Sequence, residues 1–467
     1  MENIAILVLA AGLGKRLGGK SPKVLSSLGG FPLLQHVLRT AAALAPSTTI
    51  VITGFGRDAV EAAARTGQST GFYALPKLAF VFQQEQLGTG DAVKSALSEL
   101  QTFSGTVVIL SGDVPLLRTE TLNRLLQEHH SQRATLSLLT FKCAAPNPYG
   151  VIIRDASGRF VEQIVEKKDC SPEQSRIEEV NGGVYAVDSA FLVPAIKNLT
   201  NNNAQKEYYL TDIVAKAAAE GQRVVAVLAD DHQELLGVNT FMELAEVKRI
   251  MLNREIAILI ENGVEFADPA SVYVDSGVKV AAGVKIGPNV QLRGRTEIHA
   301  GAVIEGSALL IDTVVHEGAV IKFAVRSEQA VIGKQAAVGP FANLRPETVL
   351  GEEVRIGNFV ETKKAILGKG AKASHLTYLG DAEIGADSNI GAGTITCNYD
   401  GIQKQKTKIG KGVFVGSDTC LVAPIEIADG AYIGAGSVIT KPVPADSLAF
   451  TRPPQVVKEG WAKKKRR

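Results

Sequence analysis

The chain has 467 residues, of which 45% are hydrophobic, and this length exceeds the size at which a single hydrophobic core stops growing. We therefore expect two folded domains and no wholesale disorder. Fifty lysine and arginine residues nearly balance 48 aspartate and glutamate residues, which argues against a general nucleic-acid binder, and no apolar run is long enough for membrane insertion.

The cysteines and the two chain ends bear on where the protein works. The four cysteines are far apart and form no metal-ligand pattern, which indicates reduced thiols in a cytoplasmic protein. The apolar stretch at residues 4–11 is followed at once by glycine and basic residues, so it predicts a buried strand rather than a secretory signal. The basic residues 463–467 predict a solvated tail.

The first half of the chain alternates short β-branched runs with amphipathic stretches. The runs predict strands at residues 4–9, 49–53, 79–82, 106–110, 135–141 and 224–228. The amphipathic stretches predict helices at residues 33–44, 90–100 and 119–129. Such alternation predicts a Rossmann-like α/β domain with a mostly parallel sheet, whose ligands bind at the carboxyl ends of the strands.

A single long helix is predicted from residue 240 to residue 262, where Gly263 would end it. Its predicted apolar face comprises Phe241, Leu244, Val247, Met251, Ile256 and Leu259. We expect a linker helix over residues 242–262, between a first domain of residues 1–241 and a second of residues 263–467.

Beyond this helix, aliphatic residues recur every six positions and are often followed by glycine. The clearest series is Ile409, Val415, Leu421, Ile427, Ile433 and Ile439, and similar series begin at Val272 and Ile332. Such hexapeptide repeats predict a parallel β-helix, with the aliphatic side chains stacked inside triangular coils of three repeats. The repeat is interrupted at residues 372–381 and by an insertion from residue 397 to about residue 408, and such interruptions commonly carry functional residues.

Two places in the sequence carry chemistry. Small residues in the segment 9–17 (LAAGLGKRL) would let the backbone approach phosphates, and Arg16 and Lys23 add positive charge, although an ordinary strand-to-helix turn is the simpler alternative. Asp113 follows a predicted strand, where a lone aspartate would fit a cap or turn. His375 suits a general base because its ordinary pKa is near neutral, although a lone histidine would more simply be solvated or structural.

Motifs throughout the chain decide between these alternatives. In the first half they are residues 9–17, 21–23 (SPK), 86–90 (QLGTG), 111–116 (SGDVPL), 148–150 (PYG), 165–168 (VEKK), 180–183 (VNGG), 201–205 (NNNAQ), 207–212 (EYYLTD) and 237–239 (GVN). In the second half they are residues 340–346 (PFANLRP), 358–364 (NFVETKK), 375–381 (HLTYLGD), 389–401 (NIGAGTITCNYDG) and 415–417 (VGS). In this order they resemble the bifunctional UDP-N-acetylglucosamine pyrophosphorylase/glucosamine-1-phosphate N-acetyltransferase (GlmU) family. Ser111 departs from the aromatic residue that many relatives have there.

The resemblance implies roles for residues of the first domain. Asp113 and Asn239 would hold Mg²⁺, a hard cation that prefers oxygen ligands. Arg16 and Lys23 would stabilise the triphosphate and the leaving pyrophosphate. The residues implied to bind UTP and the sugar nucleotide are Leu9, Ala10, Ala11, Gly12, Lys23, Gln83, Gly88, Thr89, Gly150, Glu166, Asn181 and Asn239.

For the second domain, the resemblance implies a left-handed β-helix that transfers an acetyl group. His375 would be the general base, with Glu361 orienting it or stabilising its charge. Glucosamine 1-phosphate would be bound by Arg345, Lys363, Tyr378 and Asn389. Acetyl-CoA would be bound by Ala392, Asn398, Tyr399, Ser417, Ala435 and Arg452. The resemblance also implies a homotrimer and small-molecule substrates, with acetylation of glucosamine 1-phosphate preceding uridylylation of N-acetylglucosamine 1-phosphate.

Two other interpretations remain open from the residues alone. One is a sugar nucleotidyltransferase with a single activity, whose β-helix serves only assembly or regulation. Such a chain would lack the segment around His375 and the insertion that carries Asn398 and Tyr399. The other is a non-enzymatic scaffold that keeps both folds, and it predicts loss of Arg16, Lys23, Asp113 and Asn239, all of which are present.

Overall fold

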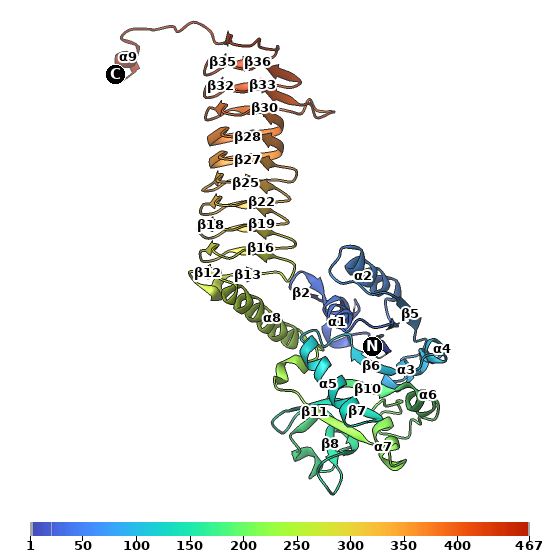
Figure 1. The fold of residues 1–467 in the computed structure, drawn as a ribbon. Helices are drawn as coiled ribbons and strands as arrows, with labels where there is room; N and C mark the ends of the chain where they lie inside the picture. Colours follow the sequence, from blue (N-terminus) through green and yellow to red (C-terminus); the bar gives the residue numbers. More distant parts are fainter. Residues whose placement is uncertain (1–2, 20, 466–467) are drawn as a thin grey trace. The chain divides into compact units, whose positions relative to one another are not determined.

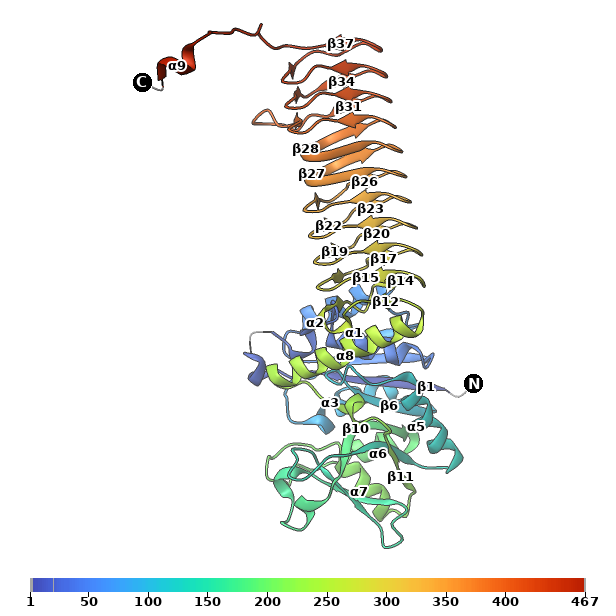
Figure 2. The same ribbon diagram turned by 90° about the vertical axis from the view of Figure 1, so that its left-hand side faces the viewer.

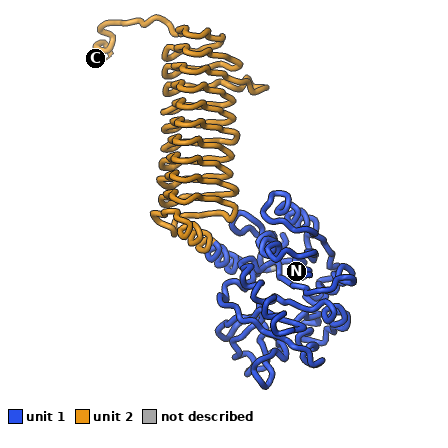
Figure 3. Tube along the Cα trace, viewed as in Figure 1, with its two compact units in different colours: residues 1–251 blue, residues 252–467 orange. Residues whose placement is uncertain are grey.

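The computed structural model describes residues 3–19 and 21–465 and divides the chain into two compact units, residues 1–251 and 252–467 (Figure 3). The boundary lies inside helix α8 (Phe241–Glu261), which confirms the long helix predicted there. On its predicted apolar face, Leu244, Val247, Met251 and Ile256 are buried and Leu259 is partly buried. Phe241 is 65% exposed, contrary to the prediction, because it begins the helix one turn ahead of the buried stripe.

The first unit is built on a sheet of strand order β11-β7-β10-β6-β1-β4-β5 (Figure 1). These strands are β1 (Ile4–Ala10), β4 (Thr48–Thr53), β5 (Leu78–Phe82), β6 (Thr106–Ser111), β7 (Leu136–Lys142), β10 (Glu179–Asp188) and β11 (Val224–Leu228). Neighbours pair in parallel except β10, which is antiparallel to both β6 and β7. The predicted strands and the mostly parallel sheet are therefore confirmed.

Several elements of this unit were not predicted. They are β8 (Val151–Arg154), β9 (Val161–Val165), β10, α2 (Arg57–Ser69), α6 (Ser189–Lys197) and α7 (Asp212–Ala219), together with the two-residue strands β2 (Ser27–Leu28) and β3 (Phe31–Pro32). The predicted helices at residues 33–44 and 119–129 are confirmed as α1 (Leu33–Ala42) and α5 (Thr119–Ser131). The helix predicted at residues 90–100 is divided at Ala96, where the backbone leaves the helical region, into α3 (Thr89–Ser95) and α4 (Leu97–Leu100).

The central strands β1 and β6 position the first site. Residues Ala5, Leu7, Val107 and Ile109 pack in one hydrophobic cluster, and the alternate residues of the same strands pack in another, so both faces of the sheet are covered. Leu9 pairs with Ser111, so the two strands end side by side. The glycine-rich segment after β1 and Asp113 after β6 therefore leave the sheet at the same edge.

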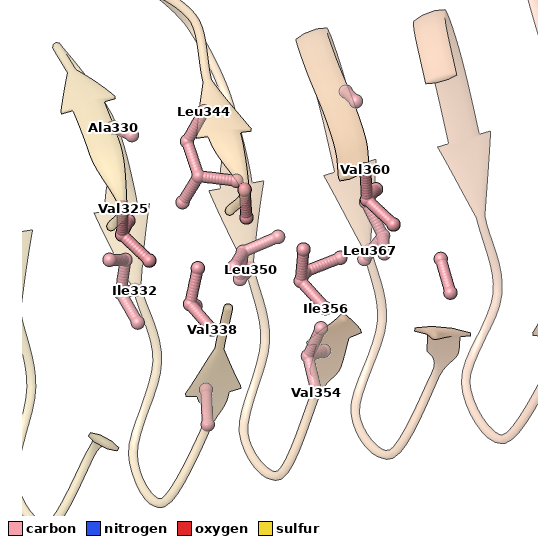
Figure 4. Packing of buried hydrophobic residues seen from close by; sticks show 14 of the residues in the cluster. Val325, Ala330, Ile332, Val338, Leu344, Leu350, Val354, Ile356, Val360 and Leu367 are labelled. Carbon is pink, nitrogen blue, oxygen red and sulfur yellow. The ribbon is translucent and has the colours of Figure 1, made fainter. Parts of the chain in front are cut away.

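The second unit is a parallel β-helix whose coils are stacked from β12 (Glu265–Phe266) to β37 (Leu448–Ala449) (Figure 2). In a regular coil a strand pairs with the chain eighteen positions later, as Lys285 of β15 (Lys285–Ile286) does with Val303 of β18 (Val303–Ile304). All residues of the series beginning at Ile332 and Ile409 are buried, and Figure 4 shows such aliphatic side chains pointing into the coil. The hexapeptide prediction is confirmed, although Val278 of the series beginning at Val272 is only partly buried, as is Val280 two residues later.

The interruption predicted at residues 372–381 is wrong. Strands β27 (Arg355–Leu367) and β28 (Lys372–Ile384) are paired along almost their whole length. Arg355 pairs with Lys372, seventeen positions later, so this coil is one residue shorter than a regular coil. The missing residue falls between Thr362 and Leu367, and Leu367, Ala373 and Leu379 are then buried at six-residue spacing, so the chain never leaves the β-helix.

The second predicted interruption is a true insertion. The chain leaves the coil after β30 (Ile395–Cys397) and returns at β31 (Thr407–Ile409), so that Asn389 of β29 (Asn389–Ile390) pairs with Phe414 of β32 (Phe414–Val415), twenty-five positions later. We call residues 398–406 the coil loop. After β37 the chain is exposed up to α9 (Trp461–Lys465), and Arg466 and Arg467 of the predicted tail lie outside the described residues.

Neither a membrane-spanning helix nor a carboxylate-rich metal cluster is found in the part of the chain that the structure describes. No helix there combines the length and the apolar character needed to cross a bilayer. No group of three or more histidine, cysteine, aspartate or glutamate side chains within residues 3–19 and 21–465 is arranged to hold a metal ion.

Candidate functional sites

The first candidate site is a pocket of about 360 Å³ at the carboxyl ends of β1 and β6. It is lined by Leu9, Ala11, Gly12, Lys23, Gln83, Gln86, Gly88, Thr89, Ala92, Ser111, Asp113 and Glu207. Gln86, Ala92, Ser111 and Glu207 were not among the predicted binding residues. Ala10 is buried, and Arg16 is exposed in the short helix η1 (Lys15–Leu17), so neither lines the pocket.

The glycine-rich segment folds closely over Lys23, the first residue of the short helix η2 (Lys23–Leu25). Gly14 has a φ of 67°, and a Cβ atom there would lie 2.8 Å from the Lys23 Cβ. A Cβ atom at Gly12 would lie 3.5 Å from the Lys23 Cε. The stem of Lys23 therefore runs along the glycine-rich segment, and its ammonium group reaches the pocket.

The Lys23 ammonium lies between the two predicted metal ligands. It forms a short ion pair with the Asp113 carboxylate and donates to the Asn239 Oδ1 over 2.9 Å. Both ion-pair side chains are mostly buried, with exposed fractions of 19% for Lys23 and 13% for Asp113. Two oxygen atoms from residues far apart in the sequence thus converge on one cationic group, and oxygen atoms are the ligands that a hard cation prefers.

Asn239 is held in place by the start of α8. The Glu243 Oε2 accepts hydrogen bonds from the backbone N–H groups of Asn239 at 2.6 Å and Thr240 at 2.8 Å. The Thr240 hydroxyl accepts in return from the Glu243 N–H at 3.2 Å. This reciprocal pattern is a capping box, and it fixes the backbone of the residue whose side chain faces Asp113 and Lys23.

Two glutamines in the loop after β5 also line the pocket. Gln83 is 4% exposed, and its Nε2 donates to the Asp91 carboxylate at 2.7 Å and to the Gly88 carbonyl at 3.2 Å. The Gln86 Nε2 donates to the Ala11 carbonyl at 2.8 Å, which connects this loop to the glycine-rich segment. Tyr208, which follows the asparagine-rich segment 201–205, is bonded to the same loop. Its N–H donates to the Leu87 carbonyl, and its carbonyl accepts from the Gly90 N–H.

Gly150, Glu166 and Asn181 lie together. The Asn181 N–H donates to the Gly150 carbonyl at 2.9 Å, and a Cβ atom at Gly150 would lie 3.4 Å from the Glu166 Oε2. Thr211 donates its hydroxyl to the Glu166 Oε1 at 3.0 Å. Burial raises the pKa of Glu166, and this effect outweighs the hydrogen bond from Thr211, which acts to lower the pKa.

The second candidate site lies on one side of the β-helix. Arg345 forms an ion pair with Glu361 at 2.8 Å, and Glu361 pairs in register with Tyr378 on the next coil. Gly380 pairs with Lys363, and a Cβ atom there would overlap the Tyr378 hydroxyl and the Asn398 amide group.

The coil loop completes this side of the β-helix. The Asn398 Nδ2 donates to the Asp381 carboxylate at 2.5 Å, and the Asn398 carbonyl accepts from the Gln405 N–H at 2.8 Å. Lys404 comes close to Lys363, and this neighbouring ammonium group lowers the pKa of Lys363. Lys404 was not predicted from the sequence. Two ammonium groups this close together favour an anionic ligand.

Four of the predicted acetyl-CoA residues form a column on successive coils. The Ala392 carbonyl accepts from the Asp418 N–H at 2.7 Å, and the Ser417 carbonyl accepts from the Gly436 N–H at 2.8 Å. The Arg452 Nη1 donates to the Ala435 carbonyl at 2.8 Å. The column of Ala392, Ser417, Ala435 and Arg452 thus continues from coil to coil. Tyr399 is 60% exposed in the coil loop, where its hydroxyl donates to the Gly401 carbonyl.

His375 and Asn389 are placed differently. Strand β28 passes along three sides of the triangular coil, because its start pairs with β29, its middle with β30 and its end with β31. Asn389 pairs with Lys372 on the first side, whereas Tyr378 lies on the second. His375 is exposed near the corner between them, opposite Asn358 of β27 rather than Glu361.

Comparison with known proteins covers both units. A nucleotidyl transferase model matches residues 5–246, a model described as the GMPPB C-terminal domain matches residues 269–338, and a model of six bacterial transferase hexapeptide repeats matches residues 406–441. The chain is 46% identical over 466 residues to the bifunctional protein GlmU of Geotalea uraniireducens, with 100% of both chains covered. The chain belongs to the GlmU family. The GlmU proteins of Trichlorobacter lovleyi (46% identical) and Koribacter versatilis (45% identical) are likewise matched over 99% and 100% of this chain and 98% of their own length.

The family models cover the first candidate site and part of the second. The nucleotidyl transferase match includes Asp113 and Asn239, whose side chains meet at Lys23. The hexapeptide match includes Ser417 and Ala435 of the column on the β-helix. The residues of the second site between Arg345 and Lys404 lie between the two models that match the second unit.

Proposed function

We propose that the two activities of this bifunctional enzyme are divided between its two ends, with uridylyl transfer in residues 1–241, acetyl transfer in residues 263–467, and residues 242–262 as the linker helix. The enzyme acetylates glucosamine 1-phosphate with acetyl-CoA and then couples N-acetylglucosamine 1-phosphate to UTP, giving UDP-N-acetylglucosamine and pyrophosphate. The observation that carries this proposal is the convergence of Asp113 and Asn239 on the Lys23 ammonium group beside the glycine-rich segment.

In uridylyl transfer, a phosphate oxygen of the sugar phosphate attacks the α-phosphorus of UTP in line, and pyrophosphate leaves. The protein contributes mainly positioning and charge neutralisation. Asp113 and Asn239 would hold the divalent cation, which we take to be Mg²⁺ and which when bound neutralises charge on the phosphates. Lys23 and, after a movement toward the pocket, Arg16 would stabilise the triphosphate and the leaving pyrophosphate.

The two ends of the nucleotide site would bind the base and the sugar. We assign uracil to Gln83 and to the backbone of Gly88 and Thr89, because these residues line the pocket beyond the glycine-rich segment. The sugar is assigned to Gly150, Glu166 and Asn181, which lie together. Hydroxyl groups of the sugar would donate to the Glu166 carboxylate, which is already oriented by Thr211.

In acetyl transfer, the amine of glucosamine 1-phosphate attacks the thioester carbonyl of acetyl-CoA. His375 would accept the amine proton, and coenzyme A would leave as its thiol, a step to which a general base typically contributes about 10²- to 10⁴-fold. Arg345, Lys363, Lys404 and Tyr378 would bind the sugar phosphate. The column of Ala392, Ser417, Ala435 and Arg452 would bind acetyl-CoA together with Asn398 and Tyr399.

A homotrimer is part of the same proposal. Phe323, Phe341 and Phe359 lie at one corner of successive coils. The rings of Phe323 and Phe341 meet edge to face at 5.7 Å, those of Phe341 and Phe359 are stacked at 5.6 Å, and the exposed fractions are 49%, 46% and 61%. Leu376, beside His375, is 64% exposed on the next coil. A continuous apolar column of this kind is typical of a subunit interface. A partner chain would also bring an Asn389 to the Tyr378 side, from which this chain's own Asn389 is separated.

We also propose that the enzyme works in the cytoplasm. All four cysteines, Cys143, Cys170, Cys397 and Cys420, are free thiols. Unpaired thiols are typical of a reducing compartment, where the glutathione and thioredoxin systems keep them reduced.

Product analysis tests the proposed reactions. The enzyme is supplied with glucosamine 1-phosphate, acetyl-CoA, UTP and Mg²⁺, and we expect coenzyme A, pyrophosphate and UDP-N-acetylglucosamine. His375→Ala should abolish acetyl transfer and leave uridylyl transfer of supplied N-acetylglucosamine 1-phosphate intact, and Asp113→Ala should do the reverse. Uridylyl transfer without any release of coenzyme A would instead favour a single-activity nucleotidyltransferase.

A further inference from the structure

The Lys23 ammonium group binds the two oxygen atoms that the proposed function assigns to a divalent cation. It is held by the Asp113 carboxylate and by the Asn239 Oδ1. Of these two partners only Asp113 is negatively charged, because the Asn239 Oδ1 belongs to a neutral amide. A divalent cation could take the same two oxygen atoms only if the ammonium group moved away, because two positive charges about 3 Å apart repel each other strongly in a partly buried site.

The same lysine has a second set of partners within reach. Its stem runs along the glycine-rich segment, with Cε next to Gly12 and Cβ next to Gly14. A triphosphate cradled by that segment would lie beside the stem and attract the ammonium group. Rotation of the side chain about its own bonds would therefore take the charge from Asp113 to the phosphates without any movement of the backbone.

We propose that Lys23 acts as an internal competitor of the divalent cation and keeps the free enzyme from binding it tightly until UTP arrives. The triphosphate draws the ammonium group away, and the Asp113 and Asn239 oxygen atoms become available at the moment when the nucleotide needs its counter-ion. Metal and nucleotide therefore bind together, and a metal ion without nucleotide is disfavoured. This inference rests on the proposed function, which supplies both the metal site and UTP.

The test measures direct binding of Mn²⁺ to the full-length protein without nucleotide. Electron paramagnetic resonance of the free ion gives the amount bound. Lys23→Met keeps the stem that packs against Gly14 and removes only the charge. Lys197→Met, on an exposed lysine of α6, is the matched control for the change in net charge. We expect Lys23→Met to bind Mn²⁺ about tenfold more tightly than the wild type and Lys197→Met. Adding Asp113→Asn to Lys23→Met should remove the gain.

The outcomes separate this inference from the function on which it rests. If Lys23→Met binds Mn²⁺ no more tightly than the wild type, while Mg²⁺-dependent release of pyrophosphate by the wild type depends on Asp113, the competition is refuted and the metal site stands. If Asp113→Asn changes neither Mn²⁺ binding by Lys23→Met nor pyrophosphate release by the wild type, the metal site itself is wrong and the inference is refuted with it.

Discussion

At Gly380, two proposed substrate-binding side chains come close to the backbone of the β-helix. A Cβ atom there would overlap the Tyr378 hydroxyl and the Asn398 amide, both of which are the ends of side chains that can move aside. We predict that Gly380→Ala folds normally but lowers kcat/KM for acetyl transfer by roughly 10- to 100-fold, because displacements of about 1 Å are costly in a reacting complex. Release of coenzyme A measures the effect.

The uridylyltransferase activity of the same variant is the control for Gly380→Ala, because its proposed residues belong to the first unit. We expect this activity and the melting temperature to remain at wild-type values. Unchanged acetyl transfer would show that Tyr378 and Asn398 do not need their present positions.

Glu166 gives a prediction about stability and pH. Burial raises the pKa of its carboxyl, so the folded state favours the protonated form. A carboxyl with a raised pKa contributes stability at low pH, and this contribution is lost as the pH rises through the pKa of the folded state. Glu166→Gln should therefore raise the melting temperature relative to the wild type at about pH 8, and the difference should shrink near pH 4, where the wild-type carboxyl is protonated.

Thermal unfolding at both pH values measures the effect of Glu166→Gln. Glu162→Gln is the matched control, because Glu162 is exposed on β9, two positions before the buried Ile164. Equal changes in the two variants, or a difference for Glu166→Gln that grows toward pH 4, would contradict the assignment of burial as the cause of the raised pKa.

At the scale of elements, the start of α8 connects helix capping to the proposed metal site. Glu243→Ala removes the acceptor for the N–H groups of Asn239 and Thr240 and should cost about 1 kcal/mol of stability in the first unit. Because Asn239 loses its anchor, the Mg²⁺ concentration required for half-maximal uridylyl transfer should also rise. Glu246→Ala, on an exposed residue of the next turn, should change neither quantity. A loss of stability without any change in Mg²⁺ dependence would separate the cap from the site.

The elements differ in how well the sequence predicted them. Apolar runs such as β1 and β6 were recognised because both of their faces are buried. Strands β8 to β10 lie in a motif-rich segment, and its polar residues, some of them assigned to the proposed sugar site, hide the alternation. Six-residue periodicity identified the β-helix, because the aliphatic side chains of every series pack in the same interior. The same method misjudged residues 372–381, because the polar residues around His375 hide the buried Ala373 and Leu379, which keep the six-residue spacing.

At the scale of the whole molecule, family motifs named most of the residues that the fold brings together. The sequence supplied Asp113 and Asn239 as separate motifs, and the structure adds that Lys23 lies between them. Lys404 could not be predicted, because its approach to Lys363 depends on the path of the coil loop rather than on any local pattern. The separation of Asn389 from Tyr378 was also hidden, because it follows from the path of β28 around the corners of the coil.

The aromatic corner provides the test of assembly. Phe359 is 61% exposed and stacks on Phe341, so Phe359→Asp should leave the fold of one chain intact while placing a charge in the proposed subunit interface, where an unpaired charge is costly to bury. Sedimentation should then show monomers, and acetyl transfer should fall with the loss of the trimer, while uridylyl transfer persists because its proposed residues lie in one unit. Ile258→Asp, on a residue of α8 that is 52% exposed, controls for adding a charge to an apolar position. An intact trimer with full acetyl transfer in Phe359→Asp would place the interface elsewhere, and monomers with full acetyl transfer would show that one chain holds the complete site despite the separation of Asn389 from Tyr378.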